Sequence, residues 1–135
     1  MRSYDSPSLM FSFLRLTPTD ITAKPQASIY ELKRRLDWGE PALTILDVRP
    51  GQEFHEFHVT GAVHVAAEQL VAWAIASLER DRDIYLYAET DADTQAAANA
   101  LRTAGFTRVA ELRGGAPAWK AVGFPVESSA FALAS

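Results

Sequence analysis

Three acidic side chains share one short segment of the chain, and their charge determines which ligands that segment can accept. Glu89, Asp91 and Asp93 lie within residues 88–93, which contain no lysine or arginine. Carboxylate oxygens can coordinate hard cations such as Mg²⁺ or Ca²⁺, or attract a cationic partner. Two like charges about 4 Å apart repel by roughly 1 kcal/mol in water and about 4 kcal/mol at a protein surface. The segment is therefore predicted to repel a bound dianion.

Other groups that could carry chemistry are few. The chain contains no cysteine, which excludes thiolate chemistry by its own side chains, cysteine-ligated metal sites and disulfides. His55 and His58 have a spacing that two metal ligands could use, but they fall in a predicted loop without helical register. His64 falls in a short predicted strand, where a structural hydrogen bond is the expected role. We predict no metal site and no cofactor.

The elements that must position the acidic segment are short β-rich runs alternating with helical stretches. Ser28 and Glu31 have the spacing of a capping box, which predicts the start of a helix. Strands are predicted at 43–48, 62–65, 84–87 and 109–112, and helices after residue 28, over 67–79, from the end of the acidic segment to 105, and over 116–122. Strands separated by helices need crossover connections. The predicted class is α/β: a central, mainly parallel sheet of about five strands flanked by helices on both faces.

Ligands of such sheets bind beyond the carboxyl ends of the strands. The segments that follow Val48 and Tyr87 are therefore the candidate binding site, with Asp47 and Arg49 as supporting residues that brace the neighbouring loops. We expect Asp91 or Asp93 to cap the helix that follows. The predicted binding residues are Ala88, Glu89, Thr90, Asp91, Ala92, Asp93 and Thr94.

Length and charge limit the classes of partner. The chain has 135 residues and a formal net charge of −4, which fits one domain and lacks the basic field that nucleic acid or an anionic membrane requires. We expect residues 1–17 to be an N-terminal appendage, residues 18–127 to form the domain and residues 128–135 to be a C-terminal tail. No targeting or membrane-spanning segment stands out, and a cytoplasmic location is predicted. The oligomeric state is left open.

Several segments resemble the signature of one known family. Asp47-Val48-Arg49, Glu53-Phe54 and the segment 58–65 are similar to the paired motifs of the rhodanese family. The segment 112–120, with Gly114, Gly115 and Trp119, resembles the closing motif of that family, and Trp119 is expected to pack in the core. These segments, together with 101–106, occur in the family's order over residues 20–127. The resemblance implies a single rhodanese-like domain.

The departure from the family lies at the catalytic loop. Active members of the rhodanese family have a cysteine after the strand that corresponds to 84–87, and this cysteine carries sulfur as a persulfide. Ala88 occupies that position here, and a methyl group cannot attack or carry sulfur. The resemblance therefore implies a catalytically inactive domain that works as a protein-binding or regulatory module, and the acidic loop favours a partner with a basic segment.

Two further interpretations stay open. The first is a metal-dependent or other enzyme that uses the loop carboxylates Glu89, Asp91 and Asp93. The second is a non-catalytic accessory of sulfur transfer, which would bind a sulfurtransferase without handling sulfur itself.

Overall fold

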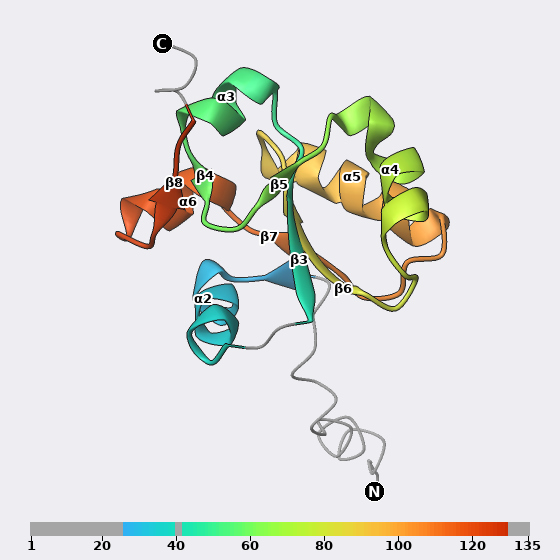
Figure 1. The fold of residues 1–135 in the computed structure, drawn as a ribbon, viewed down its shortest axis with the longest axis horizontal. Helices are drawn as coiled ribbons and strands as arrows, with labels where there is room; N and C mark the ends of the chain where they lie inside the picture. The colour runs from blue at the N-terminus through green and yellow to red at the C-terminus, as the bar shows by residue number, and fades with distance from the viewer. Residues whose placement is uncertain (1–25, 40–41, 130–135) are drawn as a thin grey trace, which may run out of the picture.

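The computed structural model describes residues 26–39 and 42–129, and a single sheet lies at its centre (Figure 1). The predicted appendage 1–17 lies outside the described residues, and of the predicted tail only 128–129 is described. The sheet has five strands in the order β2-β7-β6-β3-β5, and every neighbouring pair is parallel. The strands are β2 (Gln26–Ala27), β3 (Leu43–Asp47), β5 (Val63–His64), β6 (Asp83–Tyr87) and β7 (Val109–Leu112).

Helices cover both faces of this sheet (Figure 1), as the sequence predicts. One face carries α2 (Ile29–Asp37) and α6 (Gly115–Ala121), and the other carries α4 (Leu70–Ser77) and α5 (Asp91–Thr103). The short helix α3 (Gly51–Glu56) lies at the end of the sheet where the candidate site was predicted. The α/β class and the sheet predicted from the sequence are confirmed.

Two apolar clusters, one on each face, hold the layers together. Alternation along β6 divides its side chains between them: Tyr85 and Tyr87 join the cluster under α2 and α6, whereas Ile84 and Leu86 join the cluster under α4 and α5. Successive side chains of a strand point to opposite faces, so a strand that is covered on both sides carries apolar side chains on both faces, as residues 84–87 of β6 do. Trp119 is fully buried in the first cluster, as expected, and its indole N–H donates to the Pro125 carbonyl at 2.6 Å.

A second, smaller sheet was not predicted. The strands β4 (His58–Val59) and β8 (Val126–Glu127) pair antiparallel. Both are only two residues long, too short for the alternation of polar and apolar residues that identifies a strand in a sequence.

The helix α3, which contains His55, lies in a segment predicted to be a loop, and two predicted helices have clearly different boundaries. The predicted helix 67–79 is a 3-10 turn, η2 (Ala67–Gln69), followed by α4, which ends at Ser77. The helix α5 begins at Asp91, inside the segment predicted to be a loop. The capping box of α2 is confirmed, because the Ser28 amide donates to Glu31 and the Glu31 amide donates to the Ser28 hydroxyl.

Candidate functional site

The carboxyl ends of β3 and β6 form the centre of the site. These two strands are neighbours, and the chain leaves them toward opposite edges of the sheet, because β3 is followed by β5 and β6 by β7. Ligands of open α/β sheets bind at such a switch point. The Val48 amide donates to the Tyr87 carbonyl at 3.0 Å, so the two outgoing segments lie side by side.

A buried ion pair fixes the segment that leaves β3. Asp47 is fully buried and Arg49 is 4% exposed. The Arg49 guanidinium donates from Nε and Nη2 to the Asp47 carboxylate over 2.8–3.2 Å, and the Arg49 amide donates to Asp47 Oδ1 at 2.9 Å. The same guanidinium reaches two carbonyls, those of Glu53 and Phe57. Arg49 therefore ties α3 to the end of β3, which is the bracing role predicted for the pair.

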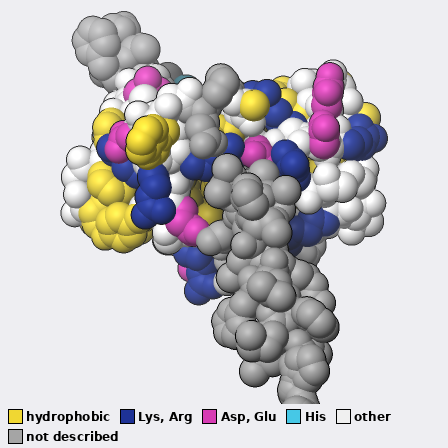
Figure 2. Space-filling model, turned by 90° about the horizontal axis from the view of Figure 1, so that it is seen from below, with side chains coloured by type: hydrophobic (Ala, Val, Ile, Leu, Met, Phe, Trp, Pro, Cys, Tyr) yellow, Lys and Arg dark blue, Asp and Glu magenta, His cyan; other side chains and the backbone are white. Residues whose placement is uncertain are grey.

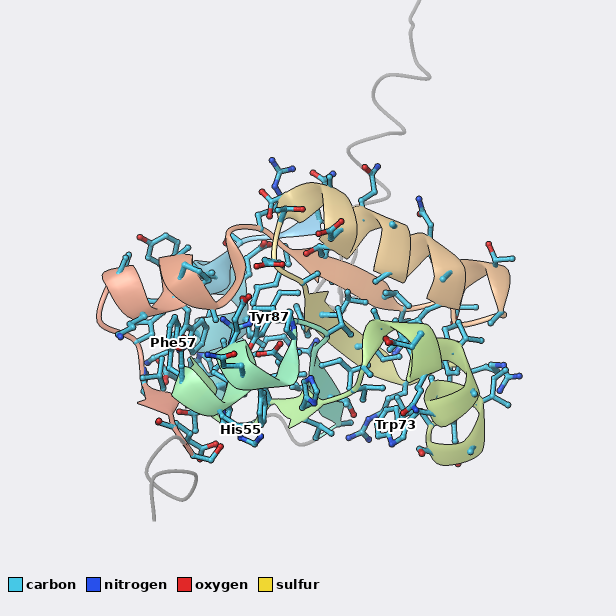
Figure 3. The ribbon with its side chains drawn as sticks, turned by 90° about the horizontal axis from the view of Figure 1, so that it is seen from above. His55, Phe57, Trp73 and Tyr87 are labelled. Atoms are coloured by element: carbon cyan, nitrogen blue, oxygen red, sulfur yellow. The ribbon has the colours of Figure 1, made fainter. Side chains whose placement is uncertain are left out.

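Aromatic rings enclose this ion pair. The guanidinium carbon of Arg49 lies 5.2 Å from the ring centre of Phe57 and 5.4 Å from that of Tyr87, and Figure 3 shows both rings at this end of the sheet. Burial alone would lower the pKa of Arg49, but the hydrogen bonds and charge of Asp47 leave that pKa raised. Burial also raises the pKa of Tyr87, whose hydroxyl accepts a hydrogen bond from the Val59 amide. The contacts of Arg49 and Tyr87 therefore stabilise the fold.

The segment that leaves β6 is organised by two threonines. The Ala88 amide donates to the Thr94 hydroxyl at 2.8 Å, and that hydroxyl donates to the Thr90 carbonyl at 3.0 Å. The Thr90 hydroxyl accepts from the Asp93 amide and caps α5. The expectation that Asp91 or Asp93 caps this helix is wrong, because the helix starts earlier and leaves both acids in its first turn.

Ala88 lies in an apolar environment. It is 8% exposed and belongs to the cluster under α4 and α5, next to side chains such as Val48 and Leu70. Position 88, which the resemblance predicts to be the nucleophile position, therefore presents only a buried methyl group.

The three loop acids point to different neighbours. Asp91 accepts from the Gly114 amide at 3.0 Å and lies 3.7 Å from Arg113, which links the loop to the turn before α6. Glu89 contacts Glu53 of α3. Asp93 lines a pocket together with Glu89. Within residues 26–39 and 42–129, no three acidic or histidine side chains converge as metal ligands would.

The carboxyl groups of Glu53 and Glu89 lie close enough for a hydrogen bond. Hydrogen bonding with Glu89 raises the pKa of Glu53, and partial burial and the Glu89 charge raise it further. Glu53 belongs to a motif in the sequence but is not among the binding residues predicted from it. Only the pairing of α3 with the loop brings these two residues together, and no sequence spacing indicates it.

A pocket of about 350 Å³ opens between the two outgoing segments and the helices α4 and α5. Its acidic residues are Glu89 and Asp93, and the other residues that line it are apolar. These are Val48, Pro50, Ala67, Leu70, Ala88, Ala96, Ala97 and Ala100. The alanines of α5 are not among the binding residues predicted from the sequence, although the alanine-rich composition of that helix is visible there.

The histidines have structural partners. His55 Nδ1 lies 2.6 Å from the Ser129 hydroxyl, His58 Nδ1 lies 2.8 Å from the Phe54 carbonyl, and His64 Nε2 lies 2.8 Å from the Arg49 carbonyl. The ring of His58 stacks on Phe54 with a centroid distance of 3.7 Å. The structural role predicted for His64 is confirmed.

Comparison with known proteins gives consistent matches. A model of the rhodanese-like domain matches residues 28–122. The HTH-type transcriptional regulator Rv0324 of Mycobacterium tuberculosis is 35% identical over 115 residues, which are 82% of this chain and 49% of that protein. A sulfurtransferase of Allochromatium vinosum is 30% identical over 95 residues, which are 70% of this chain and 87% of that protein. The chain spans about half the length of the first two curated relatives that it matches, one of which is the regulator Rv0324.

Solved structures agree with this assignment. The crystal structure of the Alr3790 protein from Anabaena sp. is 50% identical in sequence and superimposes with a TM-score of 0.73, covering 76% of this chain and 91% of that one.

In the part of the chain that the structure describes, no helix is both long and apolar enough to cross a membrane.

The buried ion pair generates the first prediction. Arg49→Met is expected to lower the free energy of unfolding by about 3–5 kcal/mol, because it leaves the buried Asp47 carboxylate without its counter-ion. Arg113→Met, which removes an exposed partner of Asp91, should change it by less than about 1 kcal/mol. Urea denaturation of both variants measures the difference. Equal effects of the two substitutions would contradict the bracing role of Arg49.

The carboxyl pair generates a prediction about pH. An acid whose pKa is higher in the folded state than in the unfolded state destabilises the fold above that pKa, and the penalty disappears as the pH falls through it. Glu89→Gln should therefore have a slightly higher urea midpoint than the wild type at pH 7. This advantage should shrink as the pH falls through the pKa of Glu53. Glu79→Gln serves as the control, and an advantage that grows on acidification would contradict the assignment.

Proposed function

The chain belongs to the rhodanese-like domain family, and on that premise we propose that it binds a protein partner and does not transfer sulfur. The observation that carries this proposal is the buried methyl group of Ala88 at the nucleophile position of the family. Sulfur transfer by this fold needs a side chain that can attack and hold a sulfur atom, and alanine has no electron pair to offer.

The charge of the loop supports the same proposal. Glu89 and Asp93 place two carboxyl groups at the mouth of the pocket, where an anionic sulfur donor would have to enter, and Glu53 is hydrogen-bonded to Glu89. Each adds a repulsion of roughly 1 kcal/mol or more toward an anion at close range. The same groups attract a partner surface rich in lysine or arginine.

The named relatives fit a regulatory or accessory role. The matching region forms half of a transcriptional regulator in one relative, and another relative is a sulfurtransferase. The second candidate is a role as a non-catalytic accessory of sulfur transfer. It is supported by the similarity to a sulfurtransferase. The cytoplasmic location expected from the sequence stays a prediction.

The catalytic part of the proposal is tested with thiosulfate and cyanide. The wild type should form thiocyanate no faster than a heat-denatured sample. Ala88→Cys alone should gain at most a trace of activity, because Glu89 and Asp93 still repel thiosulfate. Combining it with Glu89→Gln and Asp93→Asn should raise the rate about tenfold or more, since each charge contributes roughly 1 kcal/mol. Turnover by the wild type would refute the proposal, and equal rates of the two cysteine variants would refute the electrostatic argument.

The binding part is tested with a fluorescent peptide that contains four lysines and a matched peptide that contains four glutamates. The wild type should bind the basic peptide and not the acidic one, and added salt should weaken the binding. Glu89→Gln with Asp93→Asn should weaken it at least fivefold. Glu79→Gln with Asp81→Asn makes the same change in net charge in the turn before β6 and should have little effect. Equal weakening by both pairs would show that only net charge matters and would contradict the proposal.

A further inference from the structure

The pocket beside the loop combines an apolar wall with an acidic mouth. Three alanines of α5, at positions 96, 97 and 100, form one wall, and Leu70 at the start of α4 lies among the residues opposite. Alanine side chains are short, so they leave a groove along the helix surface that a chain of methylene groups can fill. The pocket of about 350 Å³ is large enough for one extended side chain of a ligand.

The acids at the mouth are without a counter-charge in the described structure. Among residues 26–39 and 42–129, no lysine or arginine is found in an ion pair with Glu89 or Asp93, whereas the neighbouring Asp91 has Arg113. Glu89 instead forms a hydrogen bond with another acid, Glu53, and this hydrogen bond and the Glu89 charge raise the pKa of Glu53. A cation placed here would relieve this repulsion.

We propose that this pocket receives one long cationic side chain, a lysine or arginine, from the partner protein. The aliphatic stem of that side chain lies against the alanine wall of α5, and its charged end lies beside Glu89 and Asp93. The inference rests on the proposed function and adds to it the part of the partner that is recognised.

Both halves of the side chain are needed for this fit. A short cation would satisfy the acids but leave the apolar wall exposed to water. An uncharged aliphatic side chain would cover the wall but leave two carboxylates unpaired beside it. Lysine and arginine carry a stem of three or four methylene groups and a charged end, and they place the two parts in apolar and polar surroundings at once.

The test compares five short peptides that differ only at their central residue. The peptides are acetyl-Gly-Ser-X-Ser-Gly-amide, with X as lysine, arginine, norleucine, diaminopropionic acid or glutamate, and binding is measured from the amide shifts of the ¹⁵N-labelled protein. The lysine or arginine peptide should shift the amides of residues 88–100 and bind at least tenfold more tightly than the other three. Norleucine has the stem without the charge, and diaminopropionic acid has the charge without the stem. Binding of either as tight as that of lysine would overturn the inference.

Variants separate this inference from the proposed function. Ala97→Phe fills the apolar part of the pocket and keeps both acids, so it should weaken the binding of the lysine peptide at least tenfold. Ala76→Phe, on the exposed face of α4, should leave this binding unchanged. If the four-lysine peptide binds equally well to Ala97→Phe and to the wild type, the acidic loop is a binding surface but the pocket is not used. If no basic peptide binds the wild type, the proposed function fails together with the inference.

Discussion

The ion pair between Asp47 and Arg49 is the interaction on which the geometry of the site depends. It stands at the end of β3, which lies between β6 and β5, and its guanidinium also donates to the carbonyls of Glu53 and Phe57. Two charges removed from water are favourable only when nearly all of their hydrogen-bonding capacity is used. The pair therefore fixes α3 above the sheet. Because α3 carries Glu53, the ion pair also determines the charge that faces the loop.

Charged side chains lie at both ends of the sheet. At the carboxyl ends of the strands, Glu89 and Asp93 line an apolar pocket, and Glu53 is hydrogen-bonded to Glu89. At the opposite end, Figure 2 shows basic side chains with acidic ones among them, and Arg35 and Arg108 both lie within ion-pair distance of the buried Asp83. Among residues 26–39 and 42–129, Asp83 therefore has arginine partners, whereas no ion pair with lysine or arginine is found for Glu89 or Asp93. In the proposed function, these two acids attract a basic segment to the end of the sheet where the pocket opens.

Much of the fold could be predicted from the sequence, because it follows from local patterns. The capping box of α2 and the apolar run of β6 specify their elements within a few residues. The start of α5 could not be placed correctly from the sequence. The loop contains acids, which are common helix caps, but the cap is Thr90, whose hydroxyl accepts from the Asp93 amide. The neighbouring Thr94 hydroxyl accepts from the Ala88 amide, a contact that no local pattern indicates. The contact between Glu53 and Glu89 joins residues far apart in the chain, and only the assembled fold produces it.

The acidic loop and the missing cysteine are consistent with each other on physical grounds. A thiol is a nucleophile only as its thiolate, and nearby carboxylates raise the pKa of a thiol because they oppose its negative charge. A cysteine at position 88 would have Glu89 beside it and would lie under an apolar cluster that disfavours ionisation further. Its thiolate would be scarce at neutral pH, and the anionic donor would be repelled by the same charges. The surroundings of Ala88 therefore oppose both steps of sulfur transfer, and the same surroundings suit a ligand of opposite charge.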